Sequence, residues 1–459
     1  MKNSIDLTTG SIYKKLVMFG TPIFFSLILQ AFYNIVDMLV VGRFIGSAGT
    51  AAIGNVSSVI WVVNAIGAGI AVGGAVLVSQ YTGARDKKSQ KDTISTLFGI
   101  TAILSIFITI LSILTYKYLF VIMDVPIEAM EYASDYMFVI CTGWIFMFGY
   151  NSVCSVMKGL GDSKCPLYFM ILATILNIVL DIIFVGPLNM GPKGAAVSTV
   201  IAECVSFVLS LIFLKRLYFK DEKIKFFALK KEKLLLLLKI GLPTMGQMVI
   251  VNISFLFINS MLNVYGVVVA SAAGTGMKIL NLMTTPCWAI GQTVCTMVGQ
   301  SMGSGNIERT RDIGKIGVKV NFLVNLLIVL IFQVFAGQLI SLFDTNPDVI
   351  SQGVLFIRVC CSLDCIMYAI MFTYDMFAVG TGDSKLGFYN SFIDSIFMRI
   401  IVCWILGFVF NFGFIGIYAG VAISSIIPAI IGAIYFKKGI WEKKQKKFVR
   451  EAVSANKVD

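Results

Sequence analysis

The chain has no histidine and few charged residues, although it is 459 residues long. Histidine is the usual general base, proton carrier and metal ligand of proteins, so its absence excludes many catalytic and metal sites. Charged residues make up 14% of the chain, whereas a soluble domain has about 25%. Hydrophobic residues make up 58%, and the mean hydropathy is +0.87. These values exclude a soluble domain and predict that lipid surrounds most of the chain.

Cysteine is not scarce, but the ten cysteines give no sign of a disulfide framework or a metal site. Most of them lie inside apolar runs, where cysteine behaves as a small hydrophobic residue. Cys360, Cys361 and Cys365 are close together in the sequence, yet no histidine accompanies them. We therefore expect these three residues to have a structural role.

Apolar runs of about 20 residues, the length that crosses about 30 Å of hydrocarbon, occur twelve times. Backbone polar groups find no water in lipid, so continuous runs of this length predict helices. No loop between the runs is long enough to hold an enzyme active site, which argues against an enzyme. The predicted spans are 15–42, 52–80, 93–116, 132–157, 166–186, 194–214, 240–263, 267–299, 316–343, 353–379, 386–410 and 415–436.

The sequence repeats itself after 221 residues. The segment KGLGDSK at Lys158–Lys164 returns as VGTGDSK at Val379–Lys385, and FGTP at Phe19–Pro22 returns as IGLP at Ile240–Pro243. Repeats of this size are typical of transporters. The repeated Gly-x-Gly-Asp lacks the Gly-Lys-Ser/Thr ending of a phosphate loop, so it predicts a structural turn at a helix end.

Each half of the chain has an even number of spans, so both halves keep the same orientation in the membrane. We therefore expect an all-α integral membrane protein with two six-helix lobes, related by a pseudo-two-fold axis along the membrane normal. The predicted parts are an N-lobe at 1–218, a basic cytoplasmic linker at 219–239, a C-lobe at 240–440 and a basic cytoplasmic tail at 441–459.

The basic residues indicate the orientation. Of the 37 Lys and Arg residues, 31 fall on one predicted side of the membrane, where both termini and the linker lie. The positive-inside rule makes this side cytoplasmic and predicts a multi-pass protein of the cell membrane. The net charge of +12 is then explained by topology and anionic lipid, without nucleic acid. Within the linker, the Lys-rich stretch 218–233 predicts an amphipathic helix on the inner surface.

Ionisable residues inside the spans are candidates for function, because each one costs free energy in lipid. Asp37 shares a helical face with Tyr33 and Gln30, and Asn177 and Asp181 are one turn apart. One isolated acid could simply form a hydrogen bond between helices. The pair, with oxygen-rich neighbours, favours a site for Na⁺ or for a shared proton. The intramembrane ionisable residues are Asp37, Asp181, Glu203, Lys278, Arg358, Asp364, Asp375, Asp394 and Arg399.

Several motifs follow one another in a fixed order along the chain. They are Pro22, Gln30-x-x-Tyr33-x-x-x-Asp37, Gly42-Arg43, Gln80-x-x-Gly83, Lys158-Gly-x-Gly-Asp162, and Asn177-x-x-x-Asp181 followed by Gly194-Ala195-Ala196 and Thr199. In this order and spacing they resemble the multidrug and toxic compound extrusion (MATE) transporters over essentially the whole chain. The resemblance implies a cation-binding or coupling site at Asp37, Asn177, Asp181, Thr199 and the carbonyl of Ala195. If the coupling ion is Na⁺, then Asp37, Asn177 and Asp181 are its expected ligands.

The second half departs from one branch of that family, which carries an acidic residue in helix 7. Helix 7 of this chain offers only amides, among them Asn252, so a second Na⁺ site is not expected there. Lys278 is a candidate partner for Asp375 or Asp394, in a structural ion pair or a transport role. We expect the substrate cavity to include Gln30, Tyr33, Asn151, Asn252, Lys278 and Asp375.

The function expected from these features is secondary active efflux of amphipathic organic cations or drugs in exchange for Na⁺ or H⁺. No cofactor is expected apart from this coupling ion, and we expect a monomer in the lipid bilayer. One alternative is a flippase for lipid-linked oligosaccharides from the same superfamily, which would line its cavity with several basic residues. Another is a membrane receptor or scaffold, but that role leaves the duplication and the paired acids without a purpose.

Overall fold

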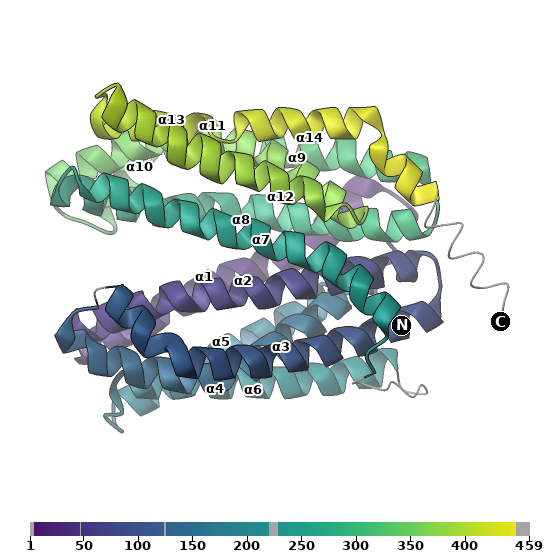
Figure 1. The fold of residues 1–459 in the computed structure, drawn as a ribbon, viewed down its shortest axis with the longest axis horizontal. Helices are drawn as coiled ribbons and strands as arrows, with labels where there is room; N and C mark the ends of the chain where they lie inside the picture. Colours follow the sequence, from purple (N-terminus) through teal and green to yellow (C-terminus); the bar gives the residue numbers. More distant parts are fainter. Residues whose placement is uncertain (1–3, 46, 124, 220–227, 447–459) are drawn as a thin grey trace. The chain divides into compact units, whose positions relative to one another are not determined.

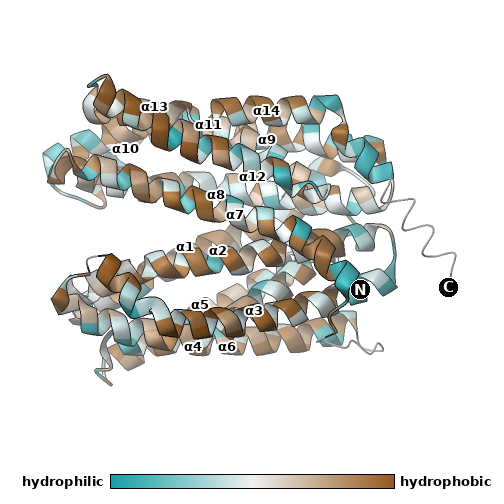
Figure 2. Cartoon of the chain, viewed as in Figure 1, coloured by the Kyte–Doolittle hydropathy of each residue, from teal (hydrophilic) through white to brown (hydrophobic). Residues whose placement is uncertain are grey.

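The computed structural model describes residues 4–45, 47–123, 125–219 and 228–446, which form helices and no strand. Twelve of the helical stretches are long and apolar enough to cross a membrane, as the sequence predicted. Figure 2 shows that hydrophobic residues dominate their lengths, whereas hydrophilic residues gather at the beginning of α7 and beyond the end of α14. The chain is therefore an all-helical, multi-pass membrane protein. Residues 220–227 of the predicted surface helix and residues 447–459 of the predicted tail lie outside the described residues.

The chain divides into two compact units, and Figure 1 labels their helices. Unit 1 consists of Met1–Asp6, Thr21–Thr82 and Asp86–Met245, and unit 2 of Leu7–Gly20, Gly83–Arg85 and Gly246–Asp459. The lobe boundaries predicted from the repeat stay a prediction. The first six helices are α1 (Ile12–Ile45), α2 (Ser47–Gly83), α3 (Lys87–Ile122), α4 (Ile127–Gly159), α5 (Lys164–Val185) and α6 (Gly191–Tyr218).

The second half contains more breaks than the first. Its helices are α7 (Lys231–Asn263), α8 (Val267–Gly303), α9 (Ile307–Val334), α10 (Ala336–Ser341), α11 (Pro347–Gly380), α12 (Ser384–Phe392), the π-helices η1 (Ile393–Val402) and η2 (Ile405–Val409), α13 (Gly413–Ile423) and α14 (Ile426–Lys438). The spans predicted at 386–410 and 415–436 are therefore interrupted. Pro428 explains one interruption, because it has no N–H to donate to the carbonyl of Ser424 one turn earlier.

The repeated Gly-x-Gly-Asp motif forms a turn in both copies, as predicted. Gly161 and Gly382 have φ angles of +88° and +82°, a conformation that suits glycine. Asp162 then accepts hydrogen bonds from the amides of Lys164 and Cys165 at the beginning of α5, both at 3.0 Å. In each copy a tyrosine from the last helix of the repeat donates to the aspartate: Tyr218 to Asp162 at 2.7 Å, and Tyr435 to Asp383 at 3.0 Å.

Each unit has its own hydrophobic core. In unit 1, Trp144 and Phe148 of α4 are both 1% exposed and pack with Ala195 of α6. In unit 2, Phe356 of α11 and Tyr418 of α13 meet edge to face with ring centroids 5.1 Å apart. Cys360, Cys361 and Cys365 belong to this second core, and none of the ten cysteines, all of which lie in the described residues, forms a disulfide. The three clustered cysteines are therefore core residues.

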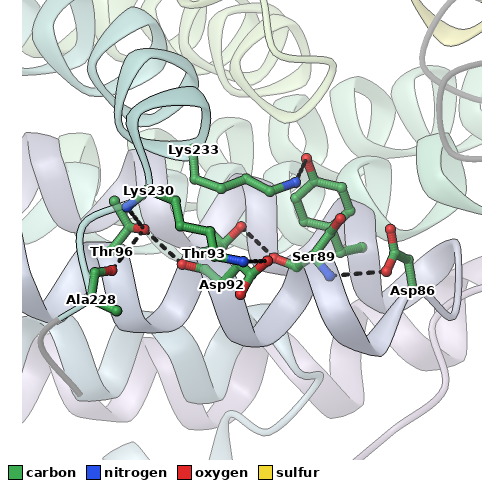
Figure 3. A network of polar contacts seen from close by, with 9 residues as sticks. Asp86, Ser89, Asp92, Thr93, Thr96, Ala228, Lys230 and Lys233 are labelled. Carbon is green, nitrogen blue, oxygen red and sulfur yellow. Dashed lines mark hydrogen bonds and ion pairs between the residues drawn. The ribbon is translucent and has the colours of Figure 1, made fainter. Parts of the chain in front are cut away.

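The chain entering α7 is fastened to α3 within unit 1, as Figure 3 shows. The backbone amide of Lys230 donates to the hydroxyl of Thr96 at 3.2 Å, and its ammonium group pairs with Asp92 at 2.5 Å. Lys233, one turn into α7, donates to the hydroxyl of Tyr81 at 2.8 Å. These contacts fix the beginning of α7 at the end of α2 and the beginning of α3.

Candidate functional site

Two carboxylates are buried inside the spans of unit 1, on the helices that the sequence predicted. Asp37 of α1 is 7% exposed, and Asp181 of α5 is fully buried. The charge of Asp37 acts on Asp181, so the two side chains share one electrostatic environment. A buried carboxylate is expensive unless it is paired or binds an ion, and two together raise that cost. The pair therefore stands out as the chemical centre of unit 1.

Polar side chains from α1, α4, α5 and α6 surround the pair. Thr199 of α6 accepts hydrogen bonds from the hydroxyl of Tyr33 at 3.0 Å and from the amide of Asn177 at 3.3 Å. Tyr136 of α4 donates to Oδ2 of Asp37 at 3.4 Å. The structure thus brings together four of the predicted side chains, Tyr33, Asn177 and Thr199 with Asp37, and adds Tyr136.

Several acceptor oxygens at this centre have no donor. Oδ1 of Asp37, Oδ1 of Asn177 and both carboxylate oxygens of Asp181 are buried and form no hydrogen bond within the described residues. The hydroxyl of Ser198 lies near Asp181, but it donates to the carbonyl of Gly194 at 2.9 Å. Unsatisfied buried acceptors of this kind require an explanation such as a bound ion. Carboxylate and amide oxygens are what hard cations prefer, so this donor set fits Na⁺ or a proton.

The remaining unit 1 predictions divide into three cases. Ala195 is fully buried in α6, one turn before Thr199, and the ligand role of its carbonyl stays a prediction. Asn151 of α4 donates to Asn64 of α2 at 3.2 Å, whereas Gln30 is exposed. Sequence reasoning did not single out Tyr136 or Asn64. Neither residue lies one helical turn from an acid in its own span, which is the signal that singled out Tyr33 and Asn177.

A cavity lies beyond the buried pair, at the ends of α1, α4, α5 and α6. Its volume is about 380 Å³, and its lining includes Phe44, Val185, Asp135 and Lys193. Val185 is one helical turn after Asp181, and Phe44 is two turns after Asp37. The cavity therefore lies at the C-terminal ends of both α1 and α5, beyond Asp37 and Asp181.

The acids of unit 2 are held differently. Oδ1 of Asp375 accepts from the amide of Asn390 at 2.6 Å, and Gly387 leaves room for Gln247 beside Asp375. Asn252 donates to the carbonyl of Met248 in its own helix at 2.9 Å. Substrate contacts of Asn252 and Asp375 stay predictions.

The buried ion pair of unit 2 does not involve Lys278, the partner that the sequence suggested for Asp375 or Asp394. Asp394 pairs instead with Arg399 at 3.0 Å, and both side chains are almost completely buried. Lys278 is exposed. In the described part of the chain, no three His, Cys, Asp or Glu side chains gather as a metal site. Lys278 as part of the substrate cavity stays a prediction.

Comparison with known proteins gives the same family over both halves. The MatE family model matches residues 22–183 and again 243–405. The probable multidrug resistance protein YpnP of Bacillus subtilis is 28% identical over 447 residues, which cover 95% of this chain and 97% of that protein. The probable multidrug resistance protein NorM of Thermotoga maritima is 24% identical over 94% of each chain.

A solved structure has the same fold. It is the outward-facing conformation of a multidrug resistance MATE family transporter of the MOP superfamily. The TM-score is 0.89 at 24% sequence identity, and the match covers 97% of this chain and 99% of that chain. The double match of the family model agrees with the 221-residue repeat in the sequence. The chain belongs to the MatE family, whose members are transporters and not enzymes.

Proposed function

We propose that the protein is a multidrug efflux antiporter that expels amphipathic organic cations in exchange for Na⁺ or H⁺. The observation that carries this proposal is the set of buried acceptor oxygens on Asp37, Asn177 and Asp181 that have no hydrogen-bond donor. Relatives over nearly the whole chain are named multidrug resistance proteins, which supports efflux of drug-like molecules.

The coupling ion would bind where these oxygens lie. Asp37 and Asp181 would supply the negative charge, and Asn177 and Thr199 would supply neutral oxygens. Thr199 already accepts two hydrogen bonds, from Tyr33 and Asn177, so ion binding there requires these contacts to rearrange. Because Tyr33 and Asp37 lie on α1, the rearrangement would be transmitted along α1. The cavity lined by Phe44 and Val185 is the proposed route by which the ion reaches the acids.

The charge of unit 1 supports a preference for cationic substrates. Asp37, Asp181 and Glu203 lie in its spans, and Glu203 is one turn from Thr199 on α6. Of the three basic residues in spans, Lys278 and Arg358 are exposed and Arg399 is already paired with Asp394. A flippase for pyrophosphate-linked lipids would line its cavity with several basic groups, whereas these three are few and the charged groups named in unit 1 are acids, so this arrangement favours efflux of cations.

The proposed location is the cell membrane, with both termini in the cytoplasm and the protein acting as a monomer. The distribution of 31 of the 37 basic residues supports this orientation. In this orientation, the cavity lined by Phe44 and Val185 faces the outside, where the coupling ion is taken up.

Transport by the purified full chain in proteoliposomes tests the proposal. A Na⁺ gradient and a pH gradient are imposed separately, and movement of ethidium is compared with movement of an anionic dye of similar size. We expect one of the two gradients to drive ethidium transport and neither to drive the anion. Transport of the anion alone, or no response to either gradient, contradicts the proposal.

A further inference from the structure

Unit 2 contains ionisable side chains that the proposed coupling does not use. We call Asp364, Asp394 and Arg399 the unit 2 triad. Asp364 lies on α11, and the other two lie on η1, with exposures of 4%, 0% and 2%. We propose that this triad binds one exchangeable proton, which the carboxyl groups of Asp364 and Asp394 share. The proposal concerns a site separate from the carboxylate pair of unit 1.

The charges of the triad do not cancel without a proton. Two carboxylates face one guanidinium group, which leaves one negative charge in excess. Nη2 of Arg399 lies 3.0 Å from Asp394, but Nε and Nη1 have no hydrogen-bond partner within the described residues. The ring of Phe255 covers the guanidinium, with 4.6 Å between Cζ and the ring centroid. Arg399 therefore compensates one carboxylate only, and a single proton removes the remaining buried charge.

The hydrogen bonds of Ser425 also indicate that the triad binds one proton. The hydroxyl oxygen of Ser425 lies 2.7 Å from Oδ1 of Asp364 and 3.1 Å from Oδ1 of Asp394. A serine hydroxyl carries one hydrogen, so it can donate to only one of these oxygens. If one carboxyl group is protonated, its O–H donates to Ser425, and Ser425 donates to the other carboxylate. Both short contacts are then hydrogen bonds.

Binding of the proton forms one bond and breaks one bond. A proton from hydronium forms one O–H bond to a carboxylate oxygen and leaves a water molecule, and release is the reverse. A metal ion does not fit the same place, because it would have to enter between oxygens that are already at hydrogen-bond distance. The triad thus favours H⁺ over Na⁺.

The backbone around the triad departs from regular helix at the points where its groups meet. Asp394 and Arg399 are five residues apart, which in an α-helix would leave them about 140° apart around the axis. Hydrogen bonds from i to i+5 define the π-helix, and this geometry brings the two residues onto one side. Ser424 and Ser425 lie in the interruption between α13 and α14. Irregular helices of this kind often mark binding sites in transporters.

Other titratable groups face the triad from the helices packed around it. Asp375 is hydrogen-bonded to Asn390 and lies within electrostatic range of Asp394. The others are thiols and a phenol, which are neutral at pH 7 in water. They are Cys360, Cys361, Cys365 and Tyr368 on α11, Cys287 on α8 and Cys403 after η1. Asp375 is therefore the neighbour that a test must separate from the triad.

Infrared difference spectroscopy between two pH values tests the proposal on the full chain in lipid bilayers, without substrate or gradient. The carbonyl stretching band of a protonated carboxyl group is followed across the pH range in which the protein stays folded. A background of Asp37→Asn, Asp181→Asn and Glu203→Gln removes the signals of the carboxyl groups in the unit 1 spans. We expect one remaining band that titrates, and we expect both Asp364→Asn and Asp394→Asn to abolish it.

The hydrogen bond to Ser425 provides a second measurement. We expect Ser425→Ala to shift the frequency of the band, and Ser425→Thr, which keeps the hydroxyl, to leave it in place. Asp375→Asn is the matched control, because Asp375 is fully buried in the same helix as Asp364. The proposal is wrong if no band titrates, if Asp375→Asn alone abolishes it, or if Ser425→Ala leaves its frequency unchanged. Because no transport is measured, these outcomes do not depend on whether the protein expels drugs.

Discussion

The carboxylates of unit 1 and unit 2 are buried to a similar degree but have different surroundings. In unit 1, both oxygens of Asp181 and one oxygen of Asp37 lack donors, and no basic side chain compensates them in the described contacts. In unit 2, Oδ1 of Asp375 accepts from an amide and Asp394 forms an ion pair with a guanidinium, although Oδ2 of Asp375 has no donor within the described residues. Unit 1 thus leaves acceptors for an ion from outside, whereas unit 2 supplies most of its compensation from its own side chains.

The 221-residue repeat sharpens this difference. The turn motif is present in both halves, with Asp162 and Asp383 each bonded to a tyrosine. The positions 221 residues after Asp37 and Asp181 are Ile258 and Val402, so the acids have no counterpart. The duplication therefore preserves the helix framework, and ionisable groups are placed separately in each half. A framework of this kind can carry one ion site or two without a change of fold.

The largest expected effect is the loss of coupling when unit 1 loses a carboxylate. Asp181→Asn keeps the shape of the side chain but removes its charge, so gradient-driven efflux should fall to the level of empty liposomes. The free energy of unfolding should not fall, because the oxygens of Asp181 form no hydrogen bond that the change would break. Transport in proteoliposomes and thermal unfolding of the purified protein measure the two quantities.

Asp37→Asn provides the companion variant. If the two acids form one site, the double variant should transport no worse than either single variant, since residues of one site are not additive. Normal transport by both single variants under both gradients would show that the coupling site lies elsewhere.

The next effect in size is on stability, and it belongs to unit 2. Arg399→Gln leaves Asp394 without its buried partner, which should cost about 3–5 kcal/mol of unfolding free energy. A dye that reacts with thiols measures unfolding, because nine of the ten cysteines are buried. Replacing both Asp394 and Arg399 by leucine should cost less than Arg399→Gln alone. An equal or larger cost for the double change would mean that the ion pair itself stabilises the fold.

These contrasts also explain which features the sequence could predict. The twelve spans and the turn motif follow from hydropathy and glycine chemistry, and both are present in the structure. Hydropathy could not predict that α9 begins at Ile307 instead of 316, because its first turns carry Glu308, Arg309 and Arg311. The partner of Asp394 was also predicted wrongly. The spacing of Asp394 and Arg399 does not suit an α-helix, and the π-helix that aligns them has no hydropathy signal.

A smaller effect is expected at Asp375. Its carboxylate accepts from Asn390 at 2.6 Å, and an amide in its place can still accept through its carbonyl oxygen. Asp375→Asn should therefore slow gradient-driven efflux only a few-fold, far less than Asp181→Asn. Both variants are assayed in the same proteoliposomes at equal protein content. Loss of transport in Asp375→Asn, together with normal transport in Asp37→Asn and Asp181→Asn, would show that the coupling ion binds in unit 2 and not in unit 1.

Cysteine labelling tests the orientation of the chain in the membrane, and we expect the cysteine substitutions to leave transport activity unchanged. The comparison of the two units assumes that both cross the membrane in the same direction. Lys88, at the beginning of α3, should face the cytoplasm, and Asn346, the exposed residue that caps α11, should face outside. Cysteine at position 88 should be protected from an impermeant thiol reagent in intact cells, and cysteine at 346 should react. The unmodified chain is the control, because its own cysteines are mostly buried. Labelling at 88 with protection at 346 would invert the orientation, and the cavity lined by Phe44 and Val185 would then face the cytoplasm.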